Sequence, residues 1–100
     1  MSLKKFRTYQ LSIEHYHLCR KLRVPTHLRD QLLRAASSIV LNLAEGSAKP
    51  TAKDQRKYYA IAFGSLRECQ AVHALLDVGD ESIVQLVDQL GASLFKMSRS

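Results

Sequence analysis

The sequence contains few residues that break helices, with two prolines and four glycines among 100 residues. It is rich in Leu, Ala, Gln, Lys and Arg, all of which favour helix. No segment alternates apolar and polar residues as a half-buried strand does, and there is no internal repeat. These absences argue against a β fold and predict one helical domain over residues 1–100.

Cysteines and long apolar runs are equally scarce. Cys19 and Cys69 are too few and too far apart for a disulfide framework or a zinc knuckle. No apolar run approaches the roughly 20 residues that span a membrane, and residues 1–17 have no signal-peptide core. We therefore expect two reduced, mostly buried thiols in a cytoplasmic protein that does not contact membranes.

Motifs for catalysis are also missing. The glycines are scattered, so no glycine-rich phosphate loop is present. No serine or cysteine has a base and an orienting acid at a recognisable spacing. The sequence therefore predicts a protein without enzymatic activity and without a cofactor.

Two helices are expected in the first half of the chain. Apolar residues recur at helical spacing over residues 6–22, and Pro25 prevents this helix from continuing. A second helix is expected over residues 27–45, with Thr26 as its cap and Gly46 as its C-terminal stop.

Two more helices are expected in the second half. Thr51 is a candidate cap for the third, which Gly79 is expected to stop, and Asp80 is a candidate cap for the fourth. Short connections place consecutive helices antiparallel to one another. The predicted fold is therefore all-α, an antiparallel up-down-up-down four-helix bundle.

The apolar residues define the faces that these helices are expected to bury. The first helix has two apolar stripes and therefore needs two partners; the stripes are Phe6, Tyr9, Ile13 and Tyr16, and Leu11, Leu18 and Leu22. Its polar wedge consists of Arg7, Gln10, Glu14, His17 and Lys21. The expected core stripe of the third helix is Tyr58, Ile61, Ala62, Ser65, Cys69, Val72 and Leu76. That of the fourth is Ile83, Leu86, Val87, Leu90, Leu94 and Met97.

Candidate metal ligands do not form a recognisable set. Glu14 and His17 have the Glu-x-x-His spacing of di-iron bundles, but the second copy that such centres require is missing. His15 and Cys19 lie one turn apart without further ligands, so we expect them at the edge of the core. Two further histidines are isolated in the sequence: His27 and His73. We therefore expect no metal site.

The charge is unevenly distributed. Residues 1–57 hold 12 Lys and Arg against 4 Asp and Glu, whereas residues 58–100 hold 3 against 5. A basic half of this kind suits a polyanion, and a simply solvated surface is the alternative. The basic residues form three clusters: Lys4, Lys5 and Arg7; Arg20, Lys21 and Arg23; and Lys49, Lys53, Arg56 and Lys57. The third cluster is the strongest candidate for binding a polyanion because a helix N-terminus adjoins it. We expect the second cluster at the opposite end of the bundle from the third.

Two carboxylates are unexpected on these helices. Glu45 lies at the C-terminal end of the second helix, where the helix dipole disfavours negative charge. Glu68 lies on a line of mostly apolar residues along the third helix, so its carboxylate must point away from an apolar surface. Either both are ordinary surface residues, or they accept hydrogen bonds that hold helices or subunits together. A ridge of small residues would admit a neighbouring helix: Ala60, Gly64 and Ala71.

These residues resemble a known family. The segments "QLLRAASSIVLNLAEGSAK" and "YYAIAFGSLREC" are similar to the pattern Q-x-x-R-A-x-x-S-I-x-x-N-I-A-E-G, then I-A-x-G-S-x-x-E, of four-helix bundles encoded in intervening sequences of bacterial 23S rRNA genes. The matching residues that we assign to a structural or assembly signature are Gln31, Arg34, Asn42, Glu45, Gly46, Gly64, Ser65 and Glu68.

The resemblance implies an oligomer and a partner. Family members resemble pentameric barrels, and the related accessory variability determinant of diversity-generating retroelements binds nucleic acid and a reverse transcriptase. We therefore expect a non-enzymatic homo-oligomer, a pentamer, that binds nucleic acid through its basic surface, with RNA favoured over DNA. The alternative is a protein-interaction adaptor, for instance for a reverse transcriptase, that does not itself bind nucleic acid.

Overall fold

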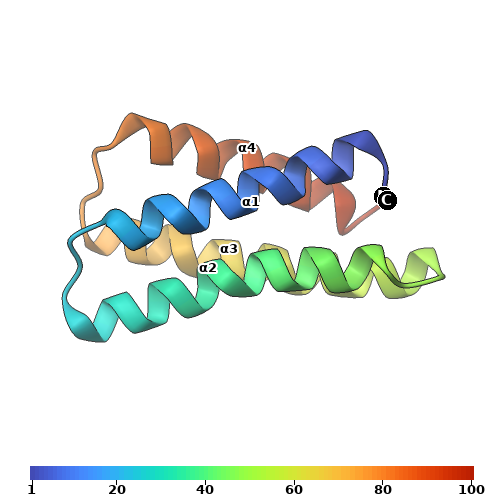
Figure 1. Ribbon diagram of the computed structural model, residues 1–100, viewed down its shortest axis with the longest axis horizontal. Helices are drawn as coiled ribbons and strands as arrows, with labels where there is room; N and C mark the ends of the chain where they lie inside the picture. Colours follow the sequence, from blue (N-terminus) through green and yellow to red (C-terminus); the bar gives the residue numbers. More distant parts are fainter.

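The computed structural model describes all 100 residues as four helices: α1 (Leu3–Lys21), α2 (Thr26–Ser47), α3 (Ala52–Leu75) and α4 (Glu81–Met97). Each helix packs against the next in the chain, and α1 packs against α4 (Figure 1). Consequently α1 and α3 face each other diagonally across the core, as do α2 and α4. The predicted all-α, up-down-up-down four-helix bundle is confirmed. None of the four helices is long and apolar enough to cross a membrane.

Two of the predicted caps are present. The Thr51 hydroxyl accepts from the Asp54 N–H at 3.2 Å, and the Asp80 carboxylate accepts from the Ser82 N–H at 2.9 Å. Thr26, in contrast, is the first residue of α2 rather than its cap, because Pro25 occupies the cap position and makes no side-chain bond.

The predicted stops at two glycines are wrong. Gly46 is buried inside α2, which continues to Ser47. The third helix ends at Leu75, before Gly79, and Asp77 takes the left-handed conformation with φ of 53°. No glycine in the chain has positive φ, so neither helix uses a glycine to turn.

Gly46 has a packing role instead. A Cβ atom at this position would lie 2.9 Å from the Tyr58 Cβ atom and 2.9 Å from the Tyr59 Cε1 atom. The end of α2 therefore approaches the start of α3 more closely than any larger residue allows. This close approach fixes how the two longest helices meet at their connection.

The core stripe of α4 agrees with the sequence prediction, and α2 also buries one apolar face. All six residues predicted for α4 are buried: Ile83, Leu86, Val87, Leu90, Leu94 and Met97. In α2 the buried side chains include Leu32, Ala35, Ala36, Ile39 and Leu43. Both helices have one continuous apolar face. Burial of that face is sufficient to orient each helix toward the core.

The buried line of α1 is polar, which the sequence analysis did not predict. It consists of Thr8, Ser12, His15 and Cys19. Most of the apolar residues on both sides of this line are half-buried and pack against the core, whereas Phe6 is 45% exposed, contrary to the prediction. Because apolar stripes flank the line, the helix inserts with its polar residues facing the core. Thr8 and Ser12 bond backbone carbonyls of their own helix, which satisfies their hydroxyls.

The predicted stripe of α3 is partly wrong. Tyr59 is buried, whereas Tyr58 is half-buried and Ile61 is 45% exposed. His73 is also buried, and its Nε2 atom lies 3.1 Å from the Nε2 atom of His15. The expectation that this histidine is isolated is therefore wrong, because the diagonal placement of α1 and α3 brings distant residues together.

We predict that Gly46→Ala destabilises the protein by about 1–2 kcal/mol. Overpacking against the two tyrosines costs roughly 1–3 kcal/mol, and the gain in helix propensity offsets up to about 1 kcal/mol. The measurement is the free energy of unfolding in urea. The control is Gly91→Ala, where the new Cβ meets only the Leu66 Cδ2 atom at 3.5 Å, so stability should rise. A stabilising Gly46→Ala change contradicts the packing role.

Candidate nucleic-acid interface and helix seam

The three predicted basic clusters lie at the two ends of the rod-shaped bundle. We call one end the terminal pole, because both chain termini and the α2–α3 connection lie there (Figure 1). It carries the first and third basic clusters: Lys4, Lys5, Arg7, Lys49, Lys53, Arg56 and Lys57. The opposite pole, at the α1–α2 connection, carries Arg20, Lys21 and Arg23. The sequence analysis treated the first and third clusters as separate, whereas the bundle topology joins them.

Direct contacts connect these two clusters. The Lys5 ammonium donates to the Gln55 amide oxygen at 3.3 Å and lies 5.2 Å from the centroid of the Tyr59 ring. Gln55 in turn donates from Nε2 to the Lys49 carbonyl at 2.9 Å. The start of α1 is thereby held against the start of α3. Gln55 was not predicted, since nothing in the sequence distinguishes it from other polar residues.

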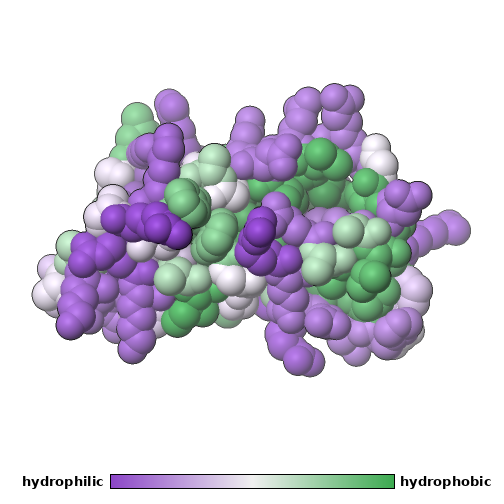
Figure 2. All heavy atoms as spheres, turned by 180° about the vertical axis from the view of Figure 1, so that it is seen from behind, coloured by the Kyte–Doolittle hydropathy of each residue, from purple (hydrophilic) through white to green (hydrophobic).

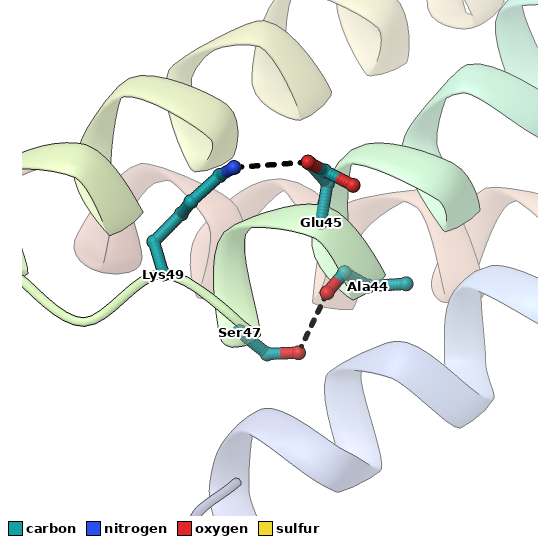
Figure 3. Close-up of polar contacts among 4 residues, drawn as sticks. All are labelled: Ala44, Glu45, Ser47 and Lys49. Atoms are coloured by element: carbon teal, nitrogen blue, oxygen red, sulfur yellow. Dashed lines mark hydrogen bonds and ion pairs between the residues drawn. The ribbon is translucent and has the colours of Figure 1, made fainter.

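Two of the predicted cations already have partners within the chain. Lys49 forms an ion pair with Glu45 at 3.0 Å, one helical turn away (Figure 3). The hydrogen bond and the charge of Glu45 raise the pKa of Lys49. Arg56 donates from Nη1 to the carbonyl oxygen of Ser100 at 2.9 Å, which ties the C-terminus to α3.

Other cations at the terminal pole are free. Their side chains are exposed and form no ion pair: Lys4, Arg7, Lys53 and Lys57. Two exposed residues that the sequence analysis omitted, Lys96 and Arg99, add positive charge at the end of α4. Only the antiparallel topology places these C-terminal residues beside the N-terminus, so sequence clusters alone miss them.

An aromatic ring lies among these cations. The half-buried Tyr58 ring has the Lys49 ammonium 5.1 Å and the Lys57 ammonium 5.9 Å from its centroid. The sequence analysis assigned Tyr58 to the core stripe of the third helix. The ring is instead partly exposed, and an accessible ring flanked by cations can stack a nucleic-acid base.

The opposite pole has its own concave site. A surface pocket of about 350 Å³ is lined by His17, Arg20, Lys21 and Arg29. The Arg29 guanidinium donates to the carbonyls of Leu22 and Arg20 at 3.3 and 3.2 Å, which fixes it at the helix connection. Arg29 was missed because it lies in the next helix. Arg23 lies in the connection between α1 and α2 and is exposed, but it does not line the pocket.

Several signature residues form a polar seam between α2 and α3. The Ser38 and Ser65 hydroxyls bond across the interface at 2.8 Å. Asn42 donates from Nδ2 to the Ser38 carbonyl at 2.8 Å and to its hydroxyl at 3.0 Å. Asn42 thus orients Ser38 toward Ser65, which explains an amide in the last turns of an amphipathic helix.

The seam also includes one of the two unexpected carboxylates. Gln31 donates from Nε2 to the Glu68 carboxylate at 3.2 Å and so links α2 to α3. The Glu45 side chain makes no hydrogen bond or ion pair with another helix and pairs only with Lys49 (Figure 3). That ammonium offsets the unfavourable position of Glu45 near the helix C-terminus. The two glutamates therefore have different roles within the subunit.

The remaining signature residues have no partner inside the subunit. The Arg34 side chain is exposed and makes no hydrogen bond or ion pair. A Cβ atom added at Gly64 would meet nothing within 4 Å, so packing within the subunit does not require a glycine there. Gly46, in contrast, is required by the α2–α3 approach.

Comparison with known families identifies the chain. The 23S rRNA-intervening sequence protein family matches residues 5–93. The protein therefore belongs to this family, as its signature residues predicted. A comparison with curated proteins and one with solved structures give no match.

We predict that Ser65→Ala lowers the free energy of unfolding by about 1 kcal/mol, because it removes the inter-helix partner of a half-buried hydroxyl. Urea denaturation followed by circular dichroism measures this loss. Glu45→Ala is the control and should leave stability unchanged within error, since exposed ion pairs contribute little. Equal losses in both variants would show that the hydrogen bond between Ser38 and Ser65 contributes no more to stability than the exposed ion pair.

Proposed function

We propose that the protein is a non-enzymatic, self-associating helical bundle that binds RNA through its terminal pole. The observation that carries this proposal is the convergence of two basic clusters, joined by the bond between Lys5 and Gln55. Four exposed cations without ion pairs surround this contact: Lys4, Arg7, Lys53 and Lys57. The family name associates these proteins with 23S rRNA, which favours RNA over DNA as the partner.

The start of α3 adds a favourable electrostatic feature to this pole. Thr51 satisfies the Asp54 N–H, while the backbone N–H groups of Ala52 and Lys53 have no intrahelical acceptor. These groups point at the region where Lys53 and Lys57 project, and together they favour a phosphate. Asp54 is the one acidic residue in this first turn, so positive charge predominates.

The expected mode of binding is to the nucleic-acid backbone. Lysine ammonium groups neutralise phosphates without reading base edges, so sequence preference should be weak and salt dependence strong. The ring of Tyr58 supplies one stacking surface for an unpaired base. Single-stranded RNA is therefore the preferred form.

Self-association is supported by surfaces that the subunit leaves uncovered. Exposed apolar side chains include Leu41 at 66% and Ile61 at 45% on the outer sides of α2 and α3. The ridge of Ala60, Gly64 and Ala71 is exposed on α3 and offers room for close helix approach. Viewed from behind, the largest continuous hydrophobic area lies in the half of the rod away from the termini (Figure 2). Such areas are uncommon on monomers.

A closed ring would repeat each basic pole around its circumference. Five subunits is the number implied by the family resemblance. The same uncovered surfaces also suit a second candidate function, an adaptor that docks another protein such as a reverse transcriptase. Lack of RNA binding by an intact oligomer would favour that candidate.

We predict that wild type binds single-stranded RNA at low salt and that Lys4, Lys53 and Lys57 changed together to Gln weaken this binding. Each lost phosphate contact should reduce the slope of log affinity against log salt by about 0.7, so the triple variant loses about 2. Fluorescence anisotropy titrations at several salt concentrations measure both quantities.

The matched control changes Arg20, Lys21 and Arg23 to Gln, which removes the same charge from the opposite pole. This variant should keep most of the wild-type affinity and slope. If wild type fails to bind at low salt, RNA binding is wrong. If both triple variants weaken binding equally, the assignment to the terminal pole is wrong.

We predict that Gly64→Leu dissociates the oligomer without unfolding the subunit. An added Cβ atom meets nothing within 4 Å in the chain, and the larger leucine side chain obstructs the small-residue ridge. Size-exclusion chromatography with light scattering at micromolar concentration should give five times the subunit mass for wild type and a smaller species for the variant.

The control for this experiment is Gln89→Leu, which places the same side chain on an exposed position of α4. It should leave the wild-type mass unchanged. A monomeric wild type refutes self-association, and an intact Gly64→Leu oligomer excludes the ridge from the contact.

A further inference from the structure

Three side chains with metal-ligating atoms converge inside the half of the bundle that lies away from the terminal pole. His15 and Cys19 lie one turn apart on α1, and His73 reaches them from α3 across the core. His15 and Cys19 are fully buried, and His73 is 9% exposed. No other group of three or more histidine, cysteine or acidic side chains in the chain comes together in this way.

The distances place all three ligating atoms around one point. The Nε2 atoms of His15 and His73 are 3.1 Å apart. The Cys19 Sγ atom lies 3.3 Å from the Nε2 atom of His15 and 3.9 Å from that of His73. A point equidistant from the three atoms is therefore about 2 Å from each, the length of a zinc–ligand bond.

Tetrahedral zinc matches these separations closely. Bond lengths of about 2.0 Å to nitrogen and 2.3 Å to sulfur imply N···N separations of roughly 3.3 Å and N···S separations of roughly 3.6 Å. The observed triangle differs from this by a few tenths of an ångström on each side. Small side-chain rotations are sufficient to reach ideal geometry.

The hydrogen bond between the two imidazoles constrains how they are protonated. A bond between the two Nε2 atoms requires the rings to take opposite tautomers, with one donating and the other accepting. The Nδ1 atoms of both rings are buried without a partner, and zinc bound to the two Nε2 atoms would leave both as donors, so these atoms do not distinguish the metal-bound from the metal-free cluster.

The chemistry of the ligands selects the metal. Neutral imidazoles and a thiolate are the donors that zinc prefers, whereas magnesium and calcium require oxygen ligands. On binding, zinc replaces the thiol proton of Cys19, which leaves to solvent, and the resulting thiolate charge is compensated by the cation.

A surface pocket adjoins one of the three ligands. His73 lines a surface pocket of about 420 Å³ whose other walls include the carboxylates of Asp77 and Asp88. These negative groups attract a cation to the mouth, and the pocket can supply a water molecule. The three protein ligands on two helices leave one tetrahedral position for a further ligand.

We propose that His15, Cys19 and His73 bind one zinc ion per chain, with water from the adjoining pocket as the fourth ligand. The site connects the two diagonal helices α1 and α3, which otherwise do not contact each other through their backbones. Zinc therefore stabilises the half of the bundle farthest from the α2–α3 connection. This inference is independent of nucleic-acid binding.

The test uses untagged, reduced protein freed of metal with a chelator. Titration with zinc, followed by competition with a chromophoric chelator, should give one site per chain and a raised melting temperature. Replacement of zinc by Co²⁺ should give the thiolate charge-transfer band and the intense visible bands of a four-coordinate site. The cobalt spectrum tests wild type directly and needs no variant to fold.

Variants then assign the ligands. Cys19→Ala and His73→Ala should each weaken zinc binding by at least about 100-fold while circular dichroism confirms their helicity. Two controls should bind as wild type: Cys69→Ala, a buried thiol outside the triangle, and His17→Ala, an exposed histidine on the same helix. Wild type that binds no zinc, a cobalt spectrum without a thiolate band, or undiminished binding by Cys19→Ala each overturns the proposal.

Discussion

The close approach of α2 and α3 at Gly46 determines how the terminal pole is built. Because this residue has no Cβ, the rings of Tyr58 and Tyr59 can lie directly against α2. Tyr59 is thereby buried and supports the Lys5 ammonium, while Tyr58 stays at the surface beside Lys49. One missing side chain thus positions basic groups from three separate segments. The charge of the pole comes from the sequence, but its arrangement comes from this contact.

The extent to which sequence predicts this molecule depends on how each helix is buried. In α4, a single apolar stripe specified both the helix and its buried face, since hydrophobic burial alone orients such a helix. In α1, two apolar stripes flank a polar line, and the pattern does not reveal that the line faces inward. The choice between Tyr58 and Tyr59 in α3 likewise depends on the shape of α2 at Gly46. Contacts between helices decide which side is buried in these cases, and the periodic pattern of apolar residues does not predict those contacts.

The same limit applies to the candidate sites. Clusters of lysine and arginine are visible in sequence, whereas the joining residue Gln55 and the C-terminal Arg99 become relevant only through the antiparallel topology. His73 is separated from His15 by 58 positions, and no local spacing relates the two. The family signature was recognisable because it lies within two short segments. Its physical meaning, a seam in which Asn42 orients Ser38 toward Ser65, required the packed helices.

Both ends of the rod carry exposed positive charge, and the cluster of His15, Cys19 and His73 lies inside the half away from the terminal pole. The central claim is that the terminal pole is the surface that RNA contacts. Its most direct test is a two-dimensional ¹⁵N–¹H NMR titration of the intact protein with a short single-stranded RNA. The account predicts shifts at the amides of Ala52, Lys53 and Lys57 and at the start of α1, with little change at Arg20 to Arg23. Shifts confined to the opposite pole, or none at low salt, would contradict it.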